Sequence, residues 1–448
     1  MSLTDKVFNA GVVGCGGAGF PTHVKFNAKV EHFIINAAEC EPLLRTDRYL
    51  MVHKASEIIK AALAIKEQLC AVDCTIALKK TYTKEINALK KAINDNKAEI
   101  TIHEMESFYP AGDEQVIAYE VVGKVVPSGG IPLDINCVVS NLATVYSVYN
   151  AMQGYPFIKK YLTVTGEVNN PTVICAPIGT SLNDCIELAG GALIDDFFVI
   201  SGGPMMGKWI TKEQAQETVV TKTTSGFIVI SANSMPAMQN RIKIEHTLNR
   251  AKSACIQCTF CTELCPRFLL GHPIEPHRIM RKLAGSTDIE AMLDDETIRN
   301  AQLCCECGVC ELYACPMQLQ PRKVNMIIKE LLEKQGVRPE KSKDELAPSA
   351  ERKNRKIPTN RAATRAGVGD YYHIEIESMK KCKPSIVKIP LLQHIGSPSE
   401  LVATIGQQVK QGDLIAKCPE GKLGANIHAS IDGKITDIGM FIEIRGGE

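Results

Sequence analysis

The chain reads Cys255-Ile-Gln-Cys258-Thr-Phe-Cys261-Thr-Glu-Leu-Cys265-Pro266, and a second run reads Cys304-Cys-Glu-Cys307-Gly-Val-Cys310-Glu-Leu-Tyr-Ala-Cys315-Pro316. In each run three cysteines are separated by two residues, and a fourth directly precedes a proline. Three closely spaced thiolates on one tight loop can reach three corners of a cubic iron–sulfur cluster, and the fourth corner needs a cysteine from elsewhere. The two runs therefore predict two [4Fe–4S] clusters.

The fourth cysteine of each run is expected to serve the other cluster, as it does in two-cluster ferredoxins. The first cluster then takes Cys255, Cys258, Cys261 and Cys315, and the second takes Cys304, Cys307, Cys310 and Cys265. Structural zinc is the main alternative, but it uses paired C-x-x-C knuckles rather than a triple run. A chain of this length does not need disulfides to fold. Cys305 breaks the spacing and is interpreted as a spare thiol.

Composition is that of a globular protein of three or four domains, with 448 residues, 45% hydrophobic and 23% charged. The net charge of +1 favours neither nucleic acid nor an anionic membrane as a partner. We expect no signal peptide and no transmembrane segment, because no apolar run approaches the roughly 18–20 residues that a membrane helix needs. Eighteen cysteines without a leader indicate a reducing, cytoplasmic location.

The pattern of apolar and charged residues changes along the chain and predicts five segments. Alternating apolar runs and helical patterns indicate an α/β domain over residues 1–155, and period-two alternation indicates a β-rich module over 156–243. The cysteine runs lie in a helical segment, 244–335. A charged, exposed linker is predicted for 336–385, with its charges concentrated between Glu340 and Asn360, followed by a compact all-β sandwich over 386–448.

A glycine-rich loop near the N-terminus is the second candidate site. Gly14, Gly16 and Gly19 fit the pattern G-x-G-x-x-G, in which a Cβ would hold a phosphate away from the backbone N–H groups. Glu39 follows Gly19 by twenty residues, where a Rossmann fold places its ribose-binding acid. The pattern alone also occurs in tight turns, so its flanking residues decide its interpretation.

Those flanking residues resemble the FMN site of the NADH-binding subunit of respiratory complex I. The shared motifs are a glycine loop ending in Phe20-Pro-Thr with a following Lys25, the turn Asn36-Ala-Ala-Glu39-Cys-Glu41-Pro42, then Gly112-Asp113-Glu114 and Asn141-Leu-Ala-Thr144. Ala38 stands where complex I has an acid, and Asp113 replaces a glutamate. The resemblance implies a Rossmann-like flavin domain that binds FMN and NADH, with Phe20 near the nicotinamide and with Glu39 and Lys25 as catalytic residues. Its implied cofactor-binding residues are Gly14, Gly16, Gly17, Gly19, Phe20, Lys25, Asn36, Glu39, Glu41, Gly112, Asp113, Glu114, Asn141 and Thr144.

The order of modules is similar to that of RnfC proteins and of PduS cobalamin reductases. The resemblance implies a β-grasp (SLBB) module after the flavin domain, a two-cluster ferredoxin-like segment and a barrel-sandwich hybrid. RnfC proteins carry the sandwich first, whereas Gln393-His-Ile-Gly396 and His428-Ala-Ser-Ile-Asp-Gly433 place it last here, as in the PduS family. That family implies electron transfer from NADH through FMN and two clusters to cobalamin. It also implies an adenosyltransferase partner and a bacterial microcompartment with its shell or lumen proteins.

Two other functions fit the same motifs. An RnfC-type protein would pass electrons to a membrane complex or to another reductase. A non-enzymatic corrinoid carrier would use the β-grasp module for binding and the clusters for structure. NADH would reduce the flavin of an electron conduit, whereas a carrier would bind corrinoid without responding to NADH.

Overall fold

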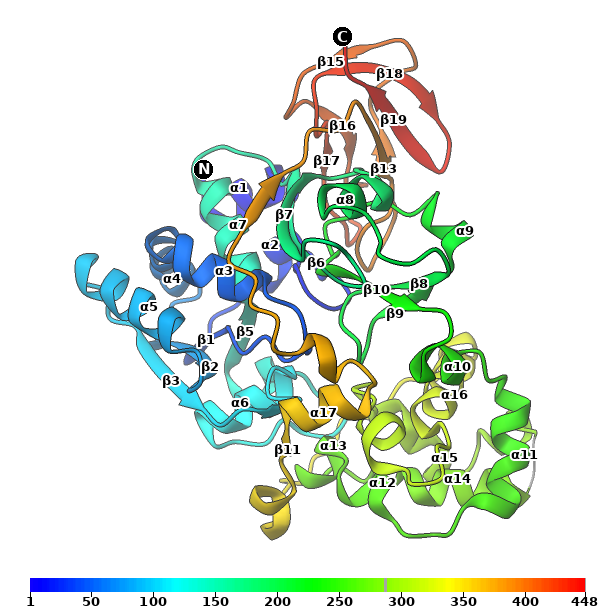
Figure 1. Cartoon of the computed structure of the whole chain (residues 1–448). Coiled ribbons are helices and arrows are strands. Elements are labelled where there is room, and N and C mark those ends of the chain that lie inside the picture. Colours follow the sequence, from blue (N-terminus) through cyan, green and yellow to red (C-terminus); the bar gives the residue numbers. More distant parts are fainter. Residues whose placement is uncertain (286–287, 448) are drawn as a thin grey trace.

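The computed structural model describes residues 1–285 and 288–447. Figure 1 shows the N-terminal α/β domain on the left, the β-rich module beside it, the cysteine-bearing helices below and the C-terminal sandwich at the top. No helix among the described residues is long and apolar enough to cross a membrane.

The N-terminal domain is built on a parallel four-stranded sheet of order β3-β2-β1-β5. Its strands are β1 His32–Asn36, β2 Asp73–Lys79, β3 Thr101–Met105 and β5 Cys137–Asn141. The helices are α1 Leu3–Asn9, α2 Thr22–Lys25, α3 Thr46–His53, α4 Ala55–Gln68, α5 Thr83–Asp95, α6 Glu114–Val122 and α7 Leu142–Met152. Phe33 and Ile35 pack in the core that contains α4 and α7, whereas Ile34 packs with α6. The sheet is therefore covered on both faces, as a parallel sheet requires.

The glycine loop lies before the first strand, between α1 and α2. Val13 and Pro21 form an isolated antiparallel bridge that closes the loop at its base. The loop therefore does not occupy the strand-to-helix turn of a dinucleotide-binding fingerprint, and Glu39 follows the first strand rather than the second. The expectation that Glu39 sits at the ribose-binding position of a Rossmann fold is wrong for this reason.

The β-rich module is a mixed sheet of order β12-β7-β6-β10-β8-β9. Its strands are β6 Lys159–Gly166, β7 Thr172–Pro177, β8 Phe197–Ser201, β9 Lys208–Ile210, β10 Gly226–Ser231 and, from much later in the chain, β12 Met379–Lys381. Its helices are α8 Leu182–Leu188, α9 Lys212–Ala215 and α10 Met235–Asn240.

The cysteine-bearing segment is helical and has a core of its own. Its helices are α11 Ile244–Ala254, α12 Phe260–Glu263, α13 Pro266–Leu269, α14 Pro276–Gly285, α15 Glu296–Arg299 and α16 Pro321–Lys334. The second run has one more residue than the first between its last two cysteines, and a π-helical turn, η4 Val309–Ala314, accommodates it.

The segment 336–385 is a structured strap rather than an exposed linker. Its strand β11 (Ile357–Pro358) pairs with β4 (Phe108–Tyr109), its helix α17 (Thr359–Arg365) follows, and β12 joins the β-rich sheet. Arg352 and Lys356 both form ion pairs with Glu120, at 2.6 and 2.8 Å. The sequence predicts a solvated charge run here, but the partner of these charges lies far away in the chain, so composition alone could not reveal it.

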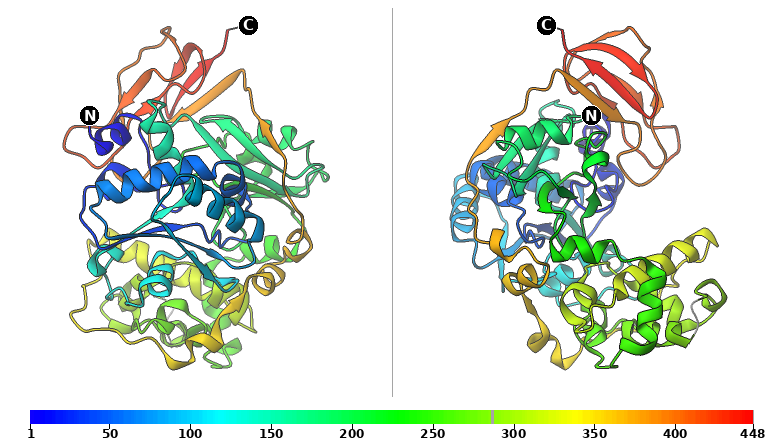
Figure 2. Two further views of the ribbon diagram at one scale, coloured as in Figure 1. Left: turned by 90° about the vertical axis from the view of Figure 1, so that its left-hand side faces the viewer. Right: turned by 45° about the vertical axis from the view of Figure 1, so that its right-hand side comes forward.

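The C-terminal sandwich consists of the sheets β13-β19-β18-β15 and β14-β16-β17. Its strands are β13 Ile386–Pro390, β14 Glu400–Leu401, β15 Gln408–Val409, β16 Leu414–Lys417, β17 Ile427–His428, β18 Gly433–Ile438 and β19 Phe441–Arg445. Figure 2 shows the sandwich against the N-terminal helix, and its Val387 and Ile389 share one core with Val7. The last domain of the chain thus packs on the first.

Candidate functional site

The glycine loop exposes Gly16, Gly17 and Ala18 to solvent, whereas Gly19 is buried. Within the described residues, the N–H groups of Gly16, Gly17, Ala18 and Gly19 donate to no protein acceptor. Gly17 has φ +61°, and a Cβ there would meet no atom within 4 Å. Such a row of unpaired N–H groups suits a phosphate or another anionic group.

Predicted flavin residues from three strand ends surround this loop. The Thr144 hydroxyl accepts from the Cys15 N–H at 2.9 Å, and Asn141 Nδ2 lies 4.0 Å from the Cβ position of Gly16. Asn36 lies beside Asn141 in the parallel β1–β5 pair, and its Nδ2 donates to the Gly112 carbonyl at 2.8 Å.

Lys25 and Glu114 form an ion pair at 2.8 Å. The donor-rich loop, the amides of Asn36 and Asn141 and this charged pair are the groups that a flavin nucleotide needs, so the residues present fit FMN.

The C-terminal sandwich closes over one end of the loop. Ile395 N–H donates to the Ala18 carbonyl at 3.0 Å, and a Cβ on Gly19 would lie 3.2 Å from the His394 Cα. Burial lowers the pKa of both His394 and His23. Phe20 follows on this side and is only partly exposed. The sandwich therefore forms part of the wall of the site.

Asp113 faces the cluster domain instead of the glycine loop. It caps α6 through hydrogen bonds from the Gln115 and Val116 N–H groups, both at 3.1 Å. It also accepts a two-pronged ion pair from Arg267, at 2.8 and 2.9 Å. Arg267 follows the Cys265-Pro266 pair at the end of the first run, so this contact ties the flavin domain to the segment that provides the predicted fourth ligand of the second cluster.

In the acidic turn, the Glu39 carbonyl and the Glu41 carboxylate accept hydrogen bonds from residues outside the glycine loop. Glu41 Oε2 accepts from the Met205 N–H at 2.9 Å, while Oε1 is buried and has no partner among the described residues. Burial raises the pKa of Glu41 to about 7. The turn that ends at Met205 belongs to the β-rich module, so Glu41 joins two domains.

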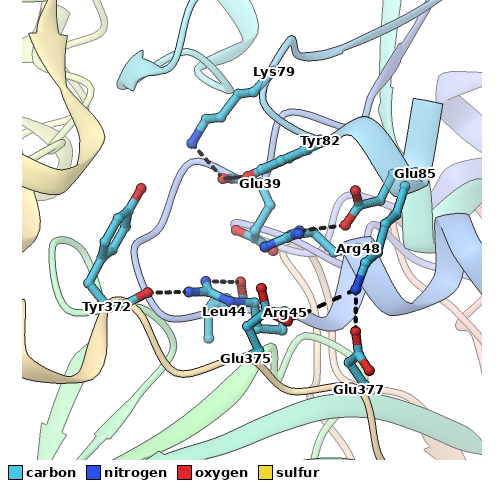
Figure 3. A network of polar contacts seen from close by, with 11 residues as sticks. Glu39, Leu44, Arg45, Arg48, Lys79, Tyr82, Glu85, Tyr372, Glu375 and Glu377 are labelled. Carbon is cyan, nitrogen blue, oxygen red and sulfur yellow. Dashed lines mark hydrogen bonds and ion pairs between the residues drawn. The ribbon is translucent and has the colours of Figure 1, made fainter. Parts of the chain in front are cut away.

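Glu39 lines a polar pocket of about 210 Å³. Figure 3 shows its backbone carbonyl accepting from Lys79 Nζ at 3.0 Å and from the Tyr82 hydroxyl at 3.2 Å. Burial, followed by the charges of Asp47 and Glu41, raises the pKa of Glu39 to about 8. Lys25 is not among the residues that line this pocket.

The sequence interpretation missed the cationic side of this pocket. It is lined by Arg45, Arg48 and Lys79, with Tyr82 and the strap residue Tyr372. Lys79 is the last residue of β2, directly after an apolar run. A charged residue at the carboxyl end of a buried strand is a sequence signal that could have identified this pocket.

The second set of predicted cluster cysteines surrounds one narrow cavity. That cavity is lined by Cys265, Cys304, Cys307 and Cys310, and also by Cys305. Asn325 and Arg322 line it as well; the Asn325 amide and Arg322 Nε are buried without hydrogen-bond partners in the described part of the chain. Unsatisfied donors beside a ring of thiols fit an iron–sulfur cluster, whose sulfurs accept such bonds.

The first set of cysteines gathers further from the flavin domain. Burial, followed by the neighbouring Cys315, Cys258 and Cys255 thiols, raises the pKa of Cys261 to about 12. Among the described residues, no three His, Cys, Asp or Glu side chains converge as ligands of a single metal ion would. Thiols spread around a volume match the corners of a cube better than the tetrahedral shell of zinc.

A direct contact joins the flavin domain to the second cysteine run. The Tyr109 hydroxyl donates to the Cys307 carbonyl at 2.7 Å. Cys307 and Val309 pack in one apolar cluster with Leu43 and Tyr109, next to Cys40 of the acidic turn. The second cluster site therefore adjoins the flavin domain through packed protein.

Four family models match the chain in turn. They are a Nuo51 FMN-binding domain over residues 7–150, an SLBB domain over 161–208, a 4Fe-4S dicluster domain over 254–320 and an RnfC barrel sandwich hybrid domain over 373–447. These matches confirm the predicted fold class and order of modules. They define a flavin and iron–sulfur electron-transfer protein.

Curated relatives identify the family within that class. The cobalamin reductase PduS of Citrobacter freundii is 38% identical over 443 residues, which span 98% of this chain and 95% of the relative. PduS of Salmonella typhimurium is also 38% identical, over 97% of this chain and 94% of the relative. A component of the Na⁺-translocating ferredoxin:NAD⁺ oxidoreductase complex of Acetobacterium woodii is 34% identical over 59% of this chain and 58% of that protein. The chain belongs to the PduS family, and the resemblance is confirmed.

Gly17→Ala is expected to lower flavin content. The added methyl meets no protein atom but occupies the space in front of the free N–H groups, and the left-handed backbone costs about 1 kcal/mol. Gly123→Ala is the matched control, since Gly123 has φ +77°, also has open space, and caps the far end of α6. Bound flavin per chain should fall at least severalfold in the first variant only. Equal flavin loss in both variants would contradict a cofactor role for the loop.

Glu39→Gln is expected to stabilise the protein near pH 7.5 by about 1–2 kcal/mol. Between pH 4.5 and about 8 the unfolded chain releases this proton while the folded chain keeps it, so the native carboxyl makes stability fall as pH rises. The advantage should shrink at pH 5, as followed by thermal unfolding. Glu375→Gln, at an exposed position of the same pocket, serves as the control. A variant that is less stable at pH 7.5 would show that Glu39 is charged and paired.

Proposed function

We propose that this protein is an NADH-dependent cobalamin reductase that carries electrons through FMN and two [4Fe–4S] clusters. The observation that carries the proposal is the packed connection from the acidic turn through Tyr109 to Cys307, in a chain that matches PduS relatives over nearly its full length. Electron transfer needs its centres held close together in a rigid protein, and this connection supplies that rigidity.

The glycine loop and its neighbours would hold FMN. The free N–H groups of Gly16 to Gly19 and the amides of Asn36 and Asn141 would bind and orient it, with Gly14 and Gly112 allowing close approach. Lys25 would place a positive charge beside the flavin, balanced by Glu114. Bound flavin would accept the two electrons of a hydride and release them singly.

The acceptor would be cobalamin. Each NADH yields NAD⁺, a proton and two electrons, which reduce one cob(III)alamin to cob(I)alamin or two cob(III)alamin to cob(II)alamin. Clusters that carry one electron each suit a metal that changes its oxidation state in single steps. In this role the protein would reduce oxidised cobalamin towards cob(I)alamin, which an adenosyltransferase would adenosylate for a B12-dependent diol dehydratase. It would do so among the shell and lumen proteins of a propanediol-utilisation microcompartment.

The eight predicted cysteines would bind the clusters in the crossed pairing. Cys265, Cys304, Cys307 and Cys310 share one cavity, and Cys315 lies with the cysteines of the other run, which supports the exchange of fourth ligands.

Serine substitutions test this pairing. Cys315→Ser is expected to damage the cluster of the first run, and Cys265→Ser that of the second. Each variant should lose up to about four of eight irons or show an altered electron paramagnetic resonance spectrum for that cluster. Cys70→Ser, at an exposed cysteine outside both runs, is the control and should keep full iron. The crossed arrangement would be refuted if Cys265→Ser damaged the cluster of the first run and Cys315→Ser damaged that of the second.

An RnfC-type role is the second candidate, because the Acetobacterium woodii protein aligns with more than half of the chain. It shares the route from NADH to the clusters and differs only in the acceptor. The carrier hypothesis differs at the first step of this route, because a carrier need not be reduced by NADH.

One anaerobic titration separates these functions. Reconstituted protein is titrated with NADH, and the flavin and cluster bands are followed before and after addition of cob(III)alamin. Bleaching followed by the spectrum of reduced cobalamin is expected. Bleaching without cobalamin reduction would favour an RnfC-type acceptor, and no bleaching with flavin and iron present would refute the NADH-dependent reductase.

A further inference from the structure

The two cysteine runs are structural repeats of each other. Gln257 and Glu306, each directly before the second cysteine of its run, have φ +54° and +60°. Thr259 and Gly308, directly after the second cysteine, have φ +61° and +77°. Because a left-handed backbone is uncommon outside glycine, its recurrence at both positions indicates the same loop geometry.

This repeat makes each residue of one loop comparable with its counterpart in the other. Ile256 and Phe260 of the first run correspond to Cys305 and Val309 of the second. Cys305 and Val309 pack in the apolar cluster that contains Leu43 and Tyr109 of the flavin domain.

The corresponding positions of the first run lack such a cover. Ile256 is 62% exposed and Phe260 is 48% exposed, whereas Val309 is 1% exposed. Cys255 and Cys315 belong to a core made only of residues between 244 and 337, with no residue of the flavin domain. Figures 1 and 2 agree in placing α11, which leads into Cys255, at the outer side of the molecule. The loop surface that the flavin domain covers at the second cluster therefore has an equivalent at the first cluster, and that equivalent surface is exposed.

The uncovered surface is apolar and uncharged. Its exposed residues, here called the exit face, are Ile256, Gln257, Phe260, Pro316 and Gln318. Two charged neighbours have partners within the structure: Arg250 donates to the Met317 carbonyl at 3.0 Å, and Glu263 accepts from Thr259 and forms an ion pair with Arg355. Lys252, on the last turn of α11, is the one exposed charge in the turn that leads into Cys255.

We propose that the exit face is where the corrinoid docks and receives electrons from the first cluster. This inference rests on the proposed cobalamin reductase function and gives it a location. A corrinoid offers an apolar macrocycle surrounded by neutral carboxamide groups, which match Ile256 and Phe260 and the side-chain amides of Gln257 and Gln318. A face of five residues falls well short of the about 20–30 residues per side of a standard protein interface, which favours a small ligand over a protein.

The test uses the full-length holoprotein with charged and uncharged variants. Ile256→Glu and Phe260→Glu place a carboxylate where an apolar ligand must displace water, and kcat/KM for cobalamin should fall by about tenfold or more. The double variant Ile256→Gln with Phe260→Gln alters the shape without adding charge and should raise KM as well. Ile131→Glu is the matched control, because Ile131 is 58% exposed and lies in the flavin domain.

Internal electron transfer separates docking from damage. Iron content and the rate at which NADH bleaches the cluster bands should match wild type in all variants, while cob(II)alamin binding weakens in the exit-face variants only. Wild-type KM for cobalamin in the Gln double variant would overturn the exit face while leaving the reductase function intact. Failure of the wild-type protein itself to reduce cobalamin would overturn both. A loss confined to kcat in the Glu variants, with normal KM in the Gln variant, would identify an effect on cluster potential and overturn docking.

Discussion

The packing of the second cysteine run against the flavin domain is the constraint that holds the remaining parts of the molecule in place. The Tyr109–Cys307 hydrogen bond joins the flavin domain to the second run, and the Asp113–Arg267 ion pair joins it to the residue two positions after Cys265, the predicted fourth ligand of the same cluster. Both contacts are shielded from water, so losing either partner leaves a buried polar group or charge unsatisfied. The fold thereby fixes the distance between the flavin domain and the first acceptor centre, which electron transfer requires.

The strap and the sandwich also hold the domains of the chain in fixed positions. The strap adds a strand beside β4, which holds Tyr109, and another to the β-rich sheet, so it clamps two domains whose contacts would otherwise be local. The sandwich shares a core with the first helix and contacts the glycine loop through Ile395. Domains that are separate in sequence therefore form one continuous scaffold around the proposed cofactors.

The proposed flavin residues divide between structural and binding roles in a way that their motif does not reveal. Asn141 and Thr144 lie next to the loop, and Asn36 lies beside Asn141 because the parallel strands β1 and β5 end in register. Asn36 in turn donates to Gly112. Asp113 belongs to the same motif as Gly112, yet it turns away to cap α6 and bind Arg267. Glu39 and Glu41 accept hydrogen bonds from residues outside the loop. Burial raises the pKa of both carboxyls, and the charges of Asp47 and Glu41 add to the rise for Glu39.

The order of modules, the two cysteine runs and the family could all be predicted from the amino-acid sequence, because metal-ligand spacing and glycine motifs are local in the chain. The predicted exchange of fourth ligands came from the pattern of two-cluster ferredoxins, because the repeat alone would also allow each run to bind its own cluster. Only the tertiary structure shows that the charged strap is folded against the flavin domain, because Glu120 is more than 200 residues from its partners Arg352 and Lys356. The same holds for the sandwich that covers the glycine loop, and for the burial of one cluster loop while its repeat is exposed. Those outcomes depend on surfaces brought together by packing, which no local pattern encodes.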